Sequence, residues 1–160
     1  MTLPFRRIAT CLALVSLAAC GSPGPPIAGA WHVVKRQYTR GDSSWTESDS
    51  QPSSWLFTPD GHYGVQEIRE SGPRPLFTDS TTDLERLAAF DVFHAHSGTW
   101  SISGDTLWIT LQLAKSPNTM TGETVGYAVS WIGPDLVLAR RSDATGEHRV
   151  TRLRRIGKSS

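Results

Sequence analysis

Short segments in which apolar and polar residues alternate recur along most of the chain, and turn-forming residues separate them. Alternation with a period of two is typical of strands that bury one face of a sheet. Turns such as Pro59-Asp60-Gly61 and Gly133-Pro134-Asp135 reverse the chain between neighbouring segments. The eight expected strands are Trp31–Tyr38, Trp55–Thr58, His62–Ile68, Phe93–Ile102, Thr106–Leu113, Tyr127–Trp131, Leu136–Ala139 and His148–Ile156. An open sheet of this size would leave two unpaired edges, so the pattern predicts an all-β fold, an eight-stranded antiparallel up-and-down barrel.

One segment departs from the strand pattern. Thr82-Asp83-Leu84-Glu85 has the Thr-x-x-Glu form of a helix capping box, and Leu84, Leu87 and Ala88 follow with helical spacing. We therefore expect one short helix between strands three and four. The polar stretches Thr39–Ser54 and Ser71–Thr81 are expected to be loops.

The first twenty residues have the form of a secretory signal. Arg6 and Arg7 precede the apolar run Ile8–Ala19, which is shorter than the roughly 20 residues that a membrane-spanning helix needs. The following Leu17-Ala18-Ala19-Cys20 resembles the lipobox of bacterial lipoprotein signal peptides, a resemblance that implies cleavage before Cys20 and acylation of that cysteine. The alternative is an ordinary cleavage site that happens to contain a cysteine.

Cysteine content favours the lipoprotein interpretation. The other cysteine, Cys11, lies in the segment that would be removed, which leaves Cys20 without a disulfide partner. Several acyl chains would hold the protein firmly on a membrane. The expected organisation is a signal peptide (residues 1–19), the lipidated Cys20 with a flexible Gly/Pro tether (20–27), a barrel domain (28–157) and a tail (158–160). Gly21 is not the aspartate that retains lipoproteins in the inner membrane, so the expected location in a Gram-negative cell envelope is the outer membrane, on its periplasmic face.

The charge balance of the mature chain is nearly neutral. Removal of residues 1–19 leaves 141 residues, enough for one compact domain, with 14 basic and 15 acidic side chains. This balance argues against a nucleic-acid partner. A basic cluster at the C-terminus is either a solvated strand face or a contact for an anionic group; its members are Arg149, Arg152, Arg154, Arg155 and Lys158.

A series of short motifs resembles the bacterial and fungal lipocalin-like domain family over about Ile27–Ile156. The motifs are Gly29-Ala30-Trp31 followed by Val33-Val34, Leu56–Tyr63, Leu87–Asp91, Ser97-Gly98-Thr99-Trp100, Pro117-Asn118 with Gly122, and Leu153-Arg154-Arg155-Ile156. Two positions depart from the family pattern, Leu153 in place of a closing aromatic residue and Trp100 where tyrosine is commoner. The resemblance implies that Trp31 packs across the closed end of a barrel. It also implies that Arg155, or alternatively Arg154, lies over the indole ring, a structural cation–π contact.

Alternation also selects the residues expected to line the barrel interior. These are Tyr63, Val65, Trp100, Ile109, Leu111, Tyr127, Val129 and Trp131. Leu107 and Leu113 share the parity of Ile109 and Leu111, so the four leucine and isoleucine side chains are expected on one face. An eight-stranded barrel either holds one small ligand or is filled by its own side chains, and a one-residue register error would turn each side chain outward.

Catalytic and metal motifs are weak. His94-Ala95-His96 has a spacing that metals use, but no Cys, Asp or Glu completes an evident motif, so we predict no metal and no cofactor. Gly41-Asp42-Ser43 faintly resembles the opening block of GDS-type esterases and is better explained as a turn. No Gly-x-Ser-x-Gly nucleophile motif is present, and no catalytic residue is predicted. The leading hypothesis is a lipid-anchored, non-catalytic barrel that binds a small apolar or amphipathic molecule; the alternative is an envelope protein-interaction module with a solid barrel.

Overall fold

The structure, a computed structural model, describes residues 27–48, 51–69, 74 and 76–157. Cys20, the signal segment and most of the tether and tail lie outside the described residues. The described strands are β1 (Gly29–Arg40), β2 (Ser43–Ser48), β3 (Ser53–Phe57), β4 (His62–Ile68), β5 (Phe93–Ser103), β6 (Thr106–Ala114), β7 (Thr124–Ile132), β8 (Asp135–Arg141) and β9 (His148–Arg155). The helices are α1 (Asp83–Asp91) and the 3-10 helix η1 (Pro117–Thr119).

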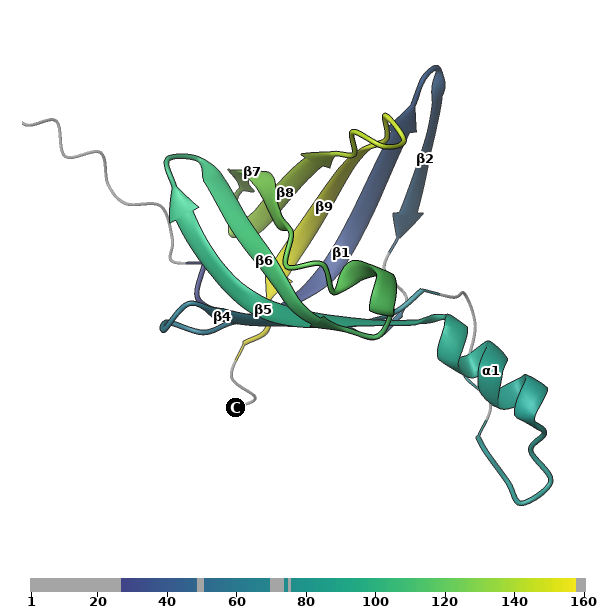
Figure 1. Ribbon diagram of the computed structural model, residues 1–160. Helices are drawn as coiled ribbons and strands as arrows, with labels where there is room; N and C mark the ends of the chain where they lie inside the picture. The colour runs from purple at the N-terminus through teal and green to yellow at the C-terminus, as the bar shows by residue number, and fades with distance from the viewer. Residues whose placement is uncertain (1–26, 49–50, 70–73, 75, 158–160) are drawn as a thin grey trace, which may run out of the picture.

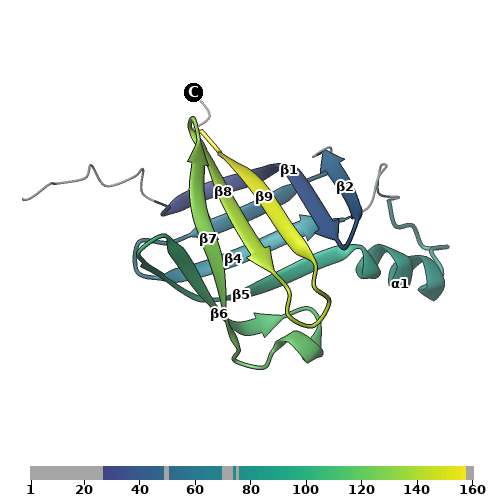
Figure 2. The same cartoon turned by 90° about the horizontal axis from the view of Figure 1, so that it is seen from above.

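The strands close into an antiparallel barrel (Figures 1 and 2). Consecutive strands pair from β3 to β9, and β9 pairs back along the length of β1. The other edge of β1 is shared, because β3 pairs with Gly29–Trp31 and β2 pairs with Lys35–Arg40. β2 and β3 therefore occupy one position in the wall, and the barrel has eight positions. The predicted fold class, an eight-stranded antiparallel barrel with one short helix, is confirmed.

The strand β2 corrects the prediction that all of Thr39–Ser54 is a loop. Ser43–Ser48 is almost entirely polar and carries no alternation signal, so its pairing with β1 is not visible in the sequence. The hairpin is stabilised by a stacked aromatic pair, Tyr38 opposite Trp45, with ring centroids 5.0 Å apart and planes 8° from parallel. Aromatic cross-strand pairs of this kind stabilise a hairpin beyond their backbone hydrogen bonds.

The helix α1 begins at the predicted capping box. The Thr82 side chain accepts from the Glu85 backbone, and the Glu85 carboxylate accepts from the Thr82 backbone N–H, so both halves of the motif are formed. The helix stands away from the barrel in both views (Figures 1 and 2). Only Ala89 of its residues is buried, and the apolar side chains of Leu84, Leu87 and Phe90 are exposed. Among the described residues, no helix has the length and apolar content needed to cross a membrane.

Two β-bulges change which residues point into the barrel. In β1 the register shifts between Val33 and Lys35, so Trp31 and Val33 are buried before the bulge, and Arg36 and Tyr38 are buried after it. One extra residue in a strand moves every following side chain to the other face.

The second bulge lies in β6. Ser97 pairs with Leu113, whereas the next residue, Gly98, pairs with Leu111, so Gln112 is the inserted residue. Leu113 therefore lies on the outer face and is 63% exposed. The prediction that Leu113 shares the inner face with Leu107, Ile109 and Leu111 is wrong for this reason.

Candidate ligand-binding site

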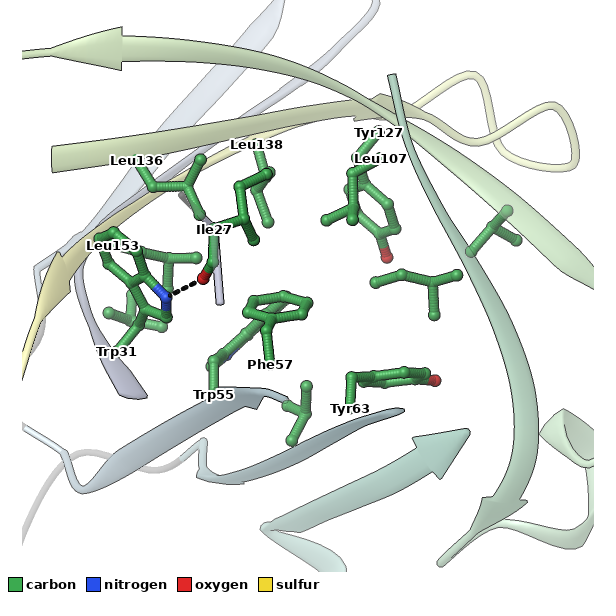
Figure 3. Close-up of a cluster of buried hydrophobic side chains, with 14 residues drawn as sticks. Ile27, Trp31, Trp55, Phe57, Tyr63, Leu107, Tyr127, Leu136, Leu138 and Leu153 are labelled. Carbon is green, nitrogen blue, oxygen red and sulfur yellow. Dashed lines mark hydrogen bonds between the residues drawn. The ribbon is translucent and has the colours of Figure 1, made fainter. Parts of the chain in front are cut away.

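The closed end of the barrel is built around Trp31, which has no exposed surface. Its indole N–H donates to the Ile27 carbonyl at 2.8 Å (Figure 3). The Arg155 guanidinium carbon lies 4.2 Å from the Trp31 ring centroid, and Arg155 Nη1 donates to the Ala28 carbonyl at 2.9 Å. The structure thus places Arg155, not Arg154, over the tryptophan, and the contact plugs the base.

Gly29 makes this contact possible. Its φ of 144° is a conformation that side chains other than glycine rarely adopt, and a Cβ atom at this position would lie 2.1 Å from Arg155 Nη1. The Gly-x-Trp motif therefore has a physical basis, because the glycine leaves room for the arginine that covers the tryptophan.

Apolar side chains fill the barrel next to Trp31. Leu136 and Leu153 are fully buried beside it (Figure 3). The Trp131 ring centroid is 6.0 Å from that of Trp31. Leu153, the departure from the family pattern, packs into this cluster as an ordinary core residue. Trp55 and Phe57 continue the cluster from β3.

The eight residues predicted to line the interior all belong to this cluster or pack against it. Tyr63, Val65, Ile109 and Tyr127 are buried members, and Trp100, Leu111, Val129 and Trp131 are half-buried residues packed against them. Their inward orientation therefore matches the predicted alternation. Contact of these residues with a ligand stays a prediction.

A polar cluster that was not predicted lies further along the interior. Glu67 is 1% exposed and pairs with the buried Arg36. Its carboxylate also accepts from Trp55 Nε1 at 2.6 Å and from Arg69 Nε at 2.9 Å. Burial by itself raises the pKa of Glu67. The two arginines and these hydrogen bonds together lower it by more than burial raises it, so the net pKa lies below its ordinary value. Glu67 is therefore an ionised group with several partners inside the barrel.

Part of this cluster was visible in the sequence. Glu67 has the same parity as Tyr63 and Val65, and strict alternation places it inside. Arg36 points inward only because of the bulge in β1, and no residue type in that segment indicates a bulge.

The two histidines of His94-Ala95-His96 sit beside this cluster. The Tyr63 hydroxyl and His96 Nδ1 are 3.1 Å apart. Burial lowers the pKa of His96 to about 4 and raises the pKa of Tyr63, so both are neutral at pH 7. The pKa of His94 is also lowered, chiefly by burial. In the described part of the chain, no three His, Cys, Asp or Glu side chains gather closely enough to hold a metal ion.

The basic cluster at the C-terminus separates onto different faces. Arg152 and Arg154 both bind the Asp135 carboxylate, at 2.6 and 3.0 Å, and the hydrogen bond from Arg154 is the largest cause of a lowered Asp135 pKa. Arg155 covers the base, and Arg149 lies opposite the inward-facing Tyr38. The four described arginines are thus divided between the two sides of the wall, because alternate residues of β9 point to opposite sides, and Lys158 lies outside the described residues.

A hollow lies on the outer surface, where the end of α1 meets β4, β5 and β6. It encloses about 510 Å³ and is lined chiefly by Phe90, Phe93, Ala95, Leu113 and Lys115. Lys115 Nζ lies 4.0 Å from the Phe90 ring centroid, which ties the helix to the end of β6. This outer groove owes its apolar wall to Leu113, which the bulge in β6 turns outward.

No protein-family model matches the chain, and no curated protein matches it. A lipocalin-like protein from Bacteroides uniformis is similar in structure, with 15% identity and a TM-score of 0.45 over 81% of this chain and 97% of that one. An uncharacterized protein from Bacteroides eggerthii has 14% identity and a TM-score of 0.43 over 78% of this chain and 97% of that one. Both TM-scores are below 0.5, so the description of the closed barrel rests on the strand pairings of this chain and not on these two structures.

Proposed function

We propose that this protein binds one small apolar or amphipathic molecule in the open end of its barrel, without catalysis. The supporting observation is that inward-facing residues away from the base, including His94 and Leu111, keep part of their surface accessible. A side chain that points into a closed barrel and is still accessible borders space that solvent can enter. Tyrosine, histidine and leucine side chains around such space suit a molecule with both apolar and polar parts.

N-Phenyl-1-naphthylamine, a neutral fluorescent amine, tests this proposal. We expect saturable binding, and we expect Leu111→Trp to weaken it at least tenfold because the larger ring occupies the proposed space. Leu113→Trp is the matched control, since Leu113 lies two residues further along the same strand on the outer face. Absence of binding, or an equal effect of both substitutions, would contradict a site inside the barrel.

Attachment to a membrane of the cell envelope through acylated Cys20 is a separate part of the proposal. It is supported by the charged segment, the short apolar run and the lipobox-like Leu17–Cys20. Cells fed an alkyne analogue of palmitate should label the native protein and leave Cys20→Ser unlabelled, and the variant should leave the membrane fraction. An unlabelled native protein would exclude the anchor.

The outer groove supports a second candidate function, a docking surface for an envelope protein. Leu84, Leu87 and Phe90 of α1 are exposed together with Leu113 of β6, an unusual amount of apolar surface for one corner of a small domain. A photoreactive residue at position 87 should give one recurring protein adduct in cells if this function is correct. Loss of that adduct in Phe90→Ala but not in Leu111→Trp would assign it to the groove.

A further inference from the structure

Two arginines face each other on the inner wall near the mouth of the barrel. Arg140 of β8 pairs directly with Arg149 of β9, and Arg149 pairs on its other side with the buried Tyr38 of β1. The Arg140 guanidinium carbon is 5.9 Å from the ring centroid of the buried Tyr127. Because cross-strand partners share one face of a sheet, these contacts direct both guanidinium groups into the barrel.

The carboxylates nearby are already occupied. Glu67 pairs with Arg36 and Arg69, Glu47 accepts from the Tyr38 hydroxyl, and Glu147 pairs with Arg40 at 2.8 Å. No carboxylate among the described residues pairs with Arg140 or Arg149. Like charges directly opposite each other on neighbouring strands destabilise a sheet. The arrangement therefore costs stability, and within the described chain no ion pair compensates for it.

The same arginines line a pocket of about 270 Å³ at the rim, beneath the turn between β8 and β9. Its other lining residues are Arg40, Ser142, Thr145 and Glu147. Since Glu147 balances Arg40, the pocket retains two positive charges together with two hydroxyl groups. Guanidinium groups of this kind recognise carboxylate and phosphate oxygens by paired hydrogen bonds.

We infer that Arg140 and Arg149 bind the anionic head group of an amphipathic ligand whose apolar body extends toward Tyr127 and Leu111. This inference rests on the proposed function and narrows it, because it assigns the charge of the ligand and the residues that select it. The interior supplies both parts of the site, since Tyr127 separates Arg140 from the apolar wall. The chemical class is a carboxylate or phosphate monoester with one hydrocarbon or aromatic body.

A pair of matched fluorescent probes tests the inference. 8-Anilino-1-naphthalenesulfonate is N-phenyl-1-naphthylamine with one added sulfonate, so a difference in affinity reports the effect of that anionic group. We expect the full chain carrying Cys20→Ser, which keeps every described residue, to bind the anionic probe at least tenfold more tightly than the neutral one. Arg140→Gln and Arg149→Gln should each weaken the anionic probe at least fivefold and leave the neutral probe unchanged.

Arg141→Gln is the matched control, because Arg141 is the exposed next residue of β8 and points to the other side of the wall. It makes the same change of charge and should leave both probes unaffected. Unchanged binding of the neutral probe shows that each variant is folded. Competition identifies the head group: dodecanoate or dodecyl phosphate should displace the anionic probe, and dodecanol should not do so at the same concentration.

The outcomes separate this inference from the proposed function. Equal affinity for the two probes, or an unchanged affinity of Arg140→Gln and Arg149→Gln for the anionic probe, would overturn the anion site and leave the barrel as a binding protein. Displacement by dodecanol as efficiently as by dodecanoate would overturn it as well. Failure of both probes to bind would overturn the inference and the proposed function together.

Discussion

Replacement of Glu67 by glutamine should strongly destabilise the protein. Glutamine has nearly the same volume and can still accept from Trp55 Nε1, but it carries no charge to balance Arg36. Arg36 has only 8% of its side chain exposed and cannot easily turn to water, whereas Arg69, with 29% exposed, can. Removing one partner of a buried ion pair costs about 3 to 5 kcal/mol, because the other charge remains buried.

Urea denaturation followed by tryptophan fluorescence measures this cost. For a domain of this size, a loss of about 3 kcal/mol corresponds to a fall in melting temperature of roughly 10 °C. Glu123→Gln is the control, because Glu123 is exposed and should change stability by less than about 0.5 kcal/mol.

A double variant separates the charge from the shape of the side chain. Arg36→Met combined with Glu67→Gln removes both charges and keeps the acceptor for Trp55. Replacement of a buried pair by uncharged residues of similar volume is often neutral or stabilising, so the double variant should be at least about 2 kcal/mol more stable than Glu67→Gln. A single variant that loses less than about 1 kcal/mol, or a double variant less stable than the single one, would refute an uncompensated charge as the cause.

Three further predictions concern the base, the helix and the histidine pair. Gly29→Ala should lower the free energy of unfolding, measured with urea, by about 1 to 3 kcal/mol, because the new Cβ displaces Arg155 and strains a φ of 144°. Gly64→Ala is the control, with no atom within 4 Å of its Cβ, and should lower it by less than about 1 kcal/mol. Thr82→Ala should lower the stability of α1 by about 1 kcal/mol and speed hydrogen exchange in α1 without changing exchange in the barrel strands. Equal changes in the helix and the strands would show that the helix unfolds only with the whole domain. The pKa of His96 is about 4 in the folded protein and about 6.5 in the unfolded protein, so the unfolded state binds more protons between these two pH values. The free energy of unfolding should therefore fall by about 2 to 3 kcal/mol from pH 6.5 to pH 4. The variant His96→Gln should lack this part of the pH dependence.

The barrel could be predicted because each wall position carries a local signal. Apolar residues recur at every second position in most strands, and each hairpin turn contains residues that favour reversal. The exception, β2, lacks such a signal because Ser43–Ser48 is held by backbone pairing with β1 and by one aromatic stack. A polar strand of this kind is determined by its partner, which single-sequence patterns do not contain.

The polar half of the candidate site was harder to predict, since it depends on where alternation breaks. The inserted residues, Val34 in β1 and Gln112 in β6, have side chains that are common in regular strands. Without Val34, Arg36 would face solvent and Glu67 would have lost its buried partner. Each bulge is therefore recognised only by its consequence, which is a buried charge with a partner on a different strand for β1 and an exposed leucine for β6.

The distribution of charge along the barrel sets the direction in which a ligand of the proposed class can enter. Trp31 and the leucines around it close one end, so an apolar body cannot pass through the base. Glu67 is neutralised by its own arginines, whereas Arg140 and Arg149 at the rim have no described carboxylate partner. An amphiphile that entered head first would bring its anion among the apolar side chains around Trp31 and leave the rim arginines opposite hydrocarbon. Entry with the body first pairs the anion with the two arginines, so a head group at the rim is the arrangement that satisfies every charge in the interior.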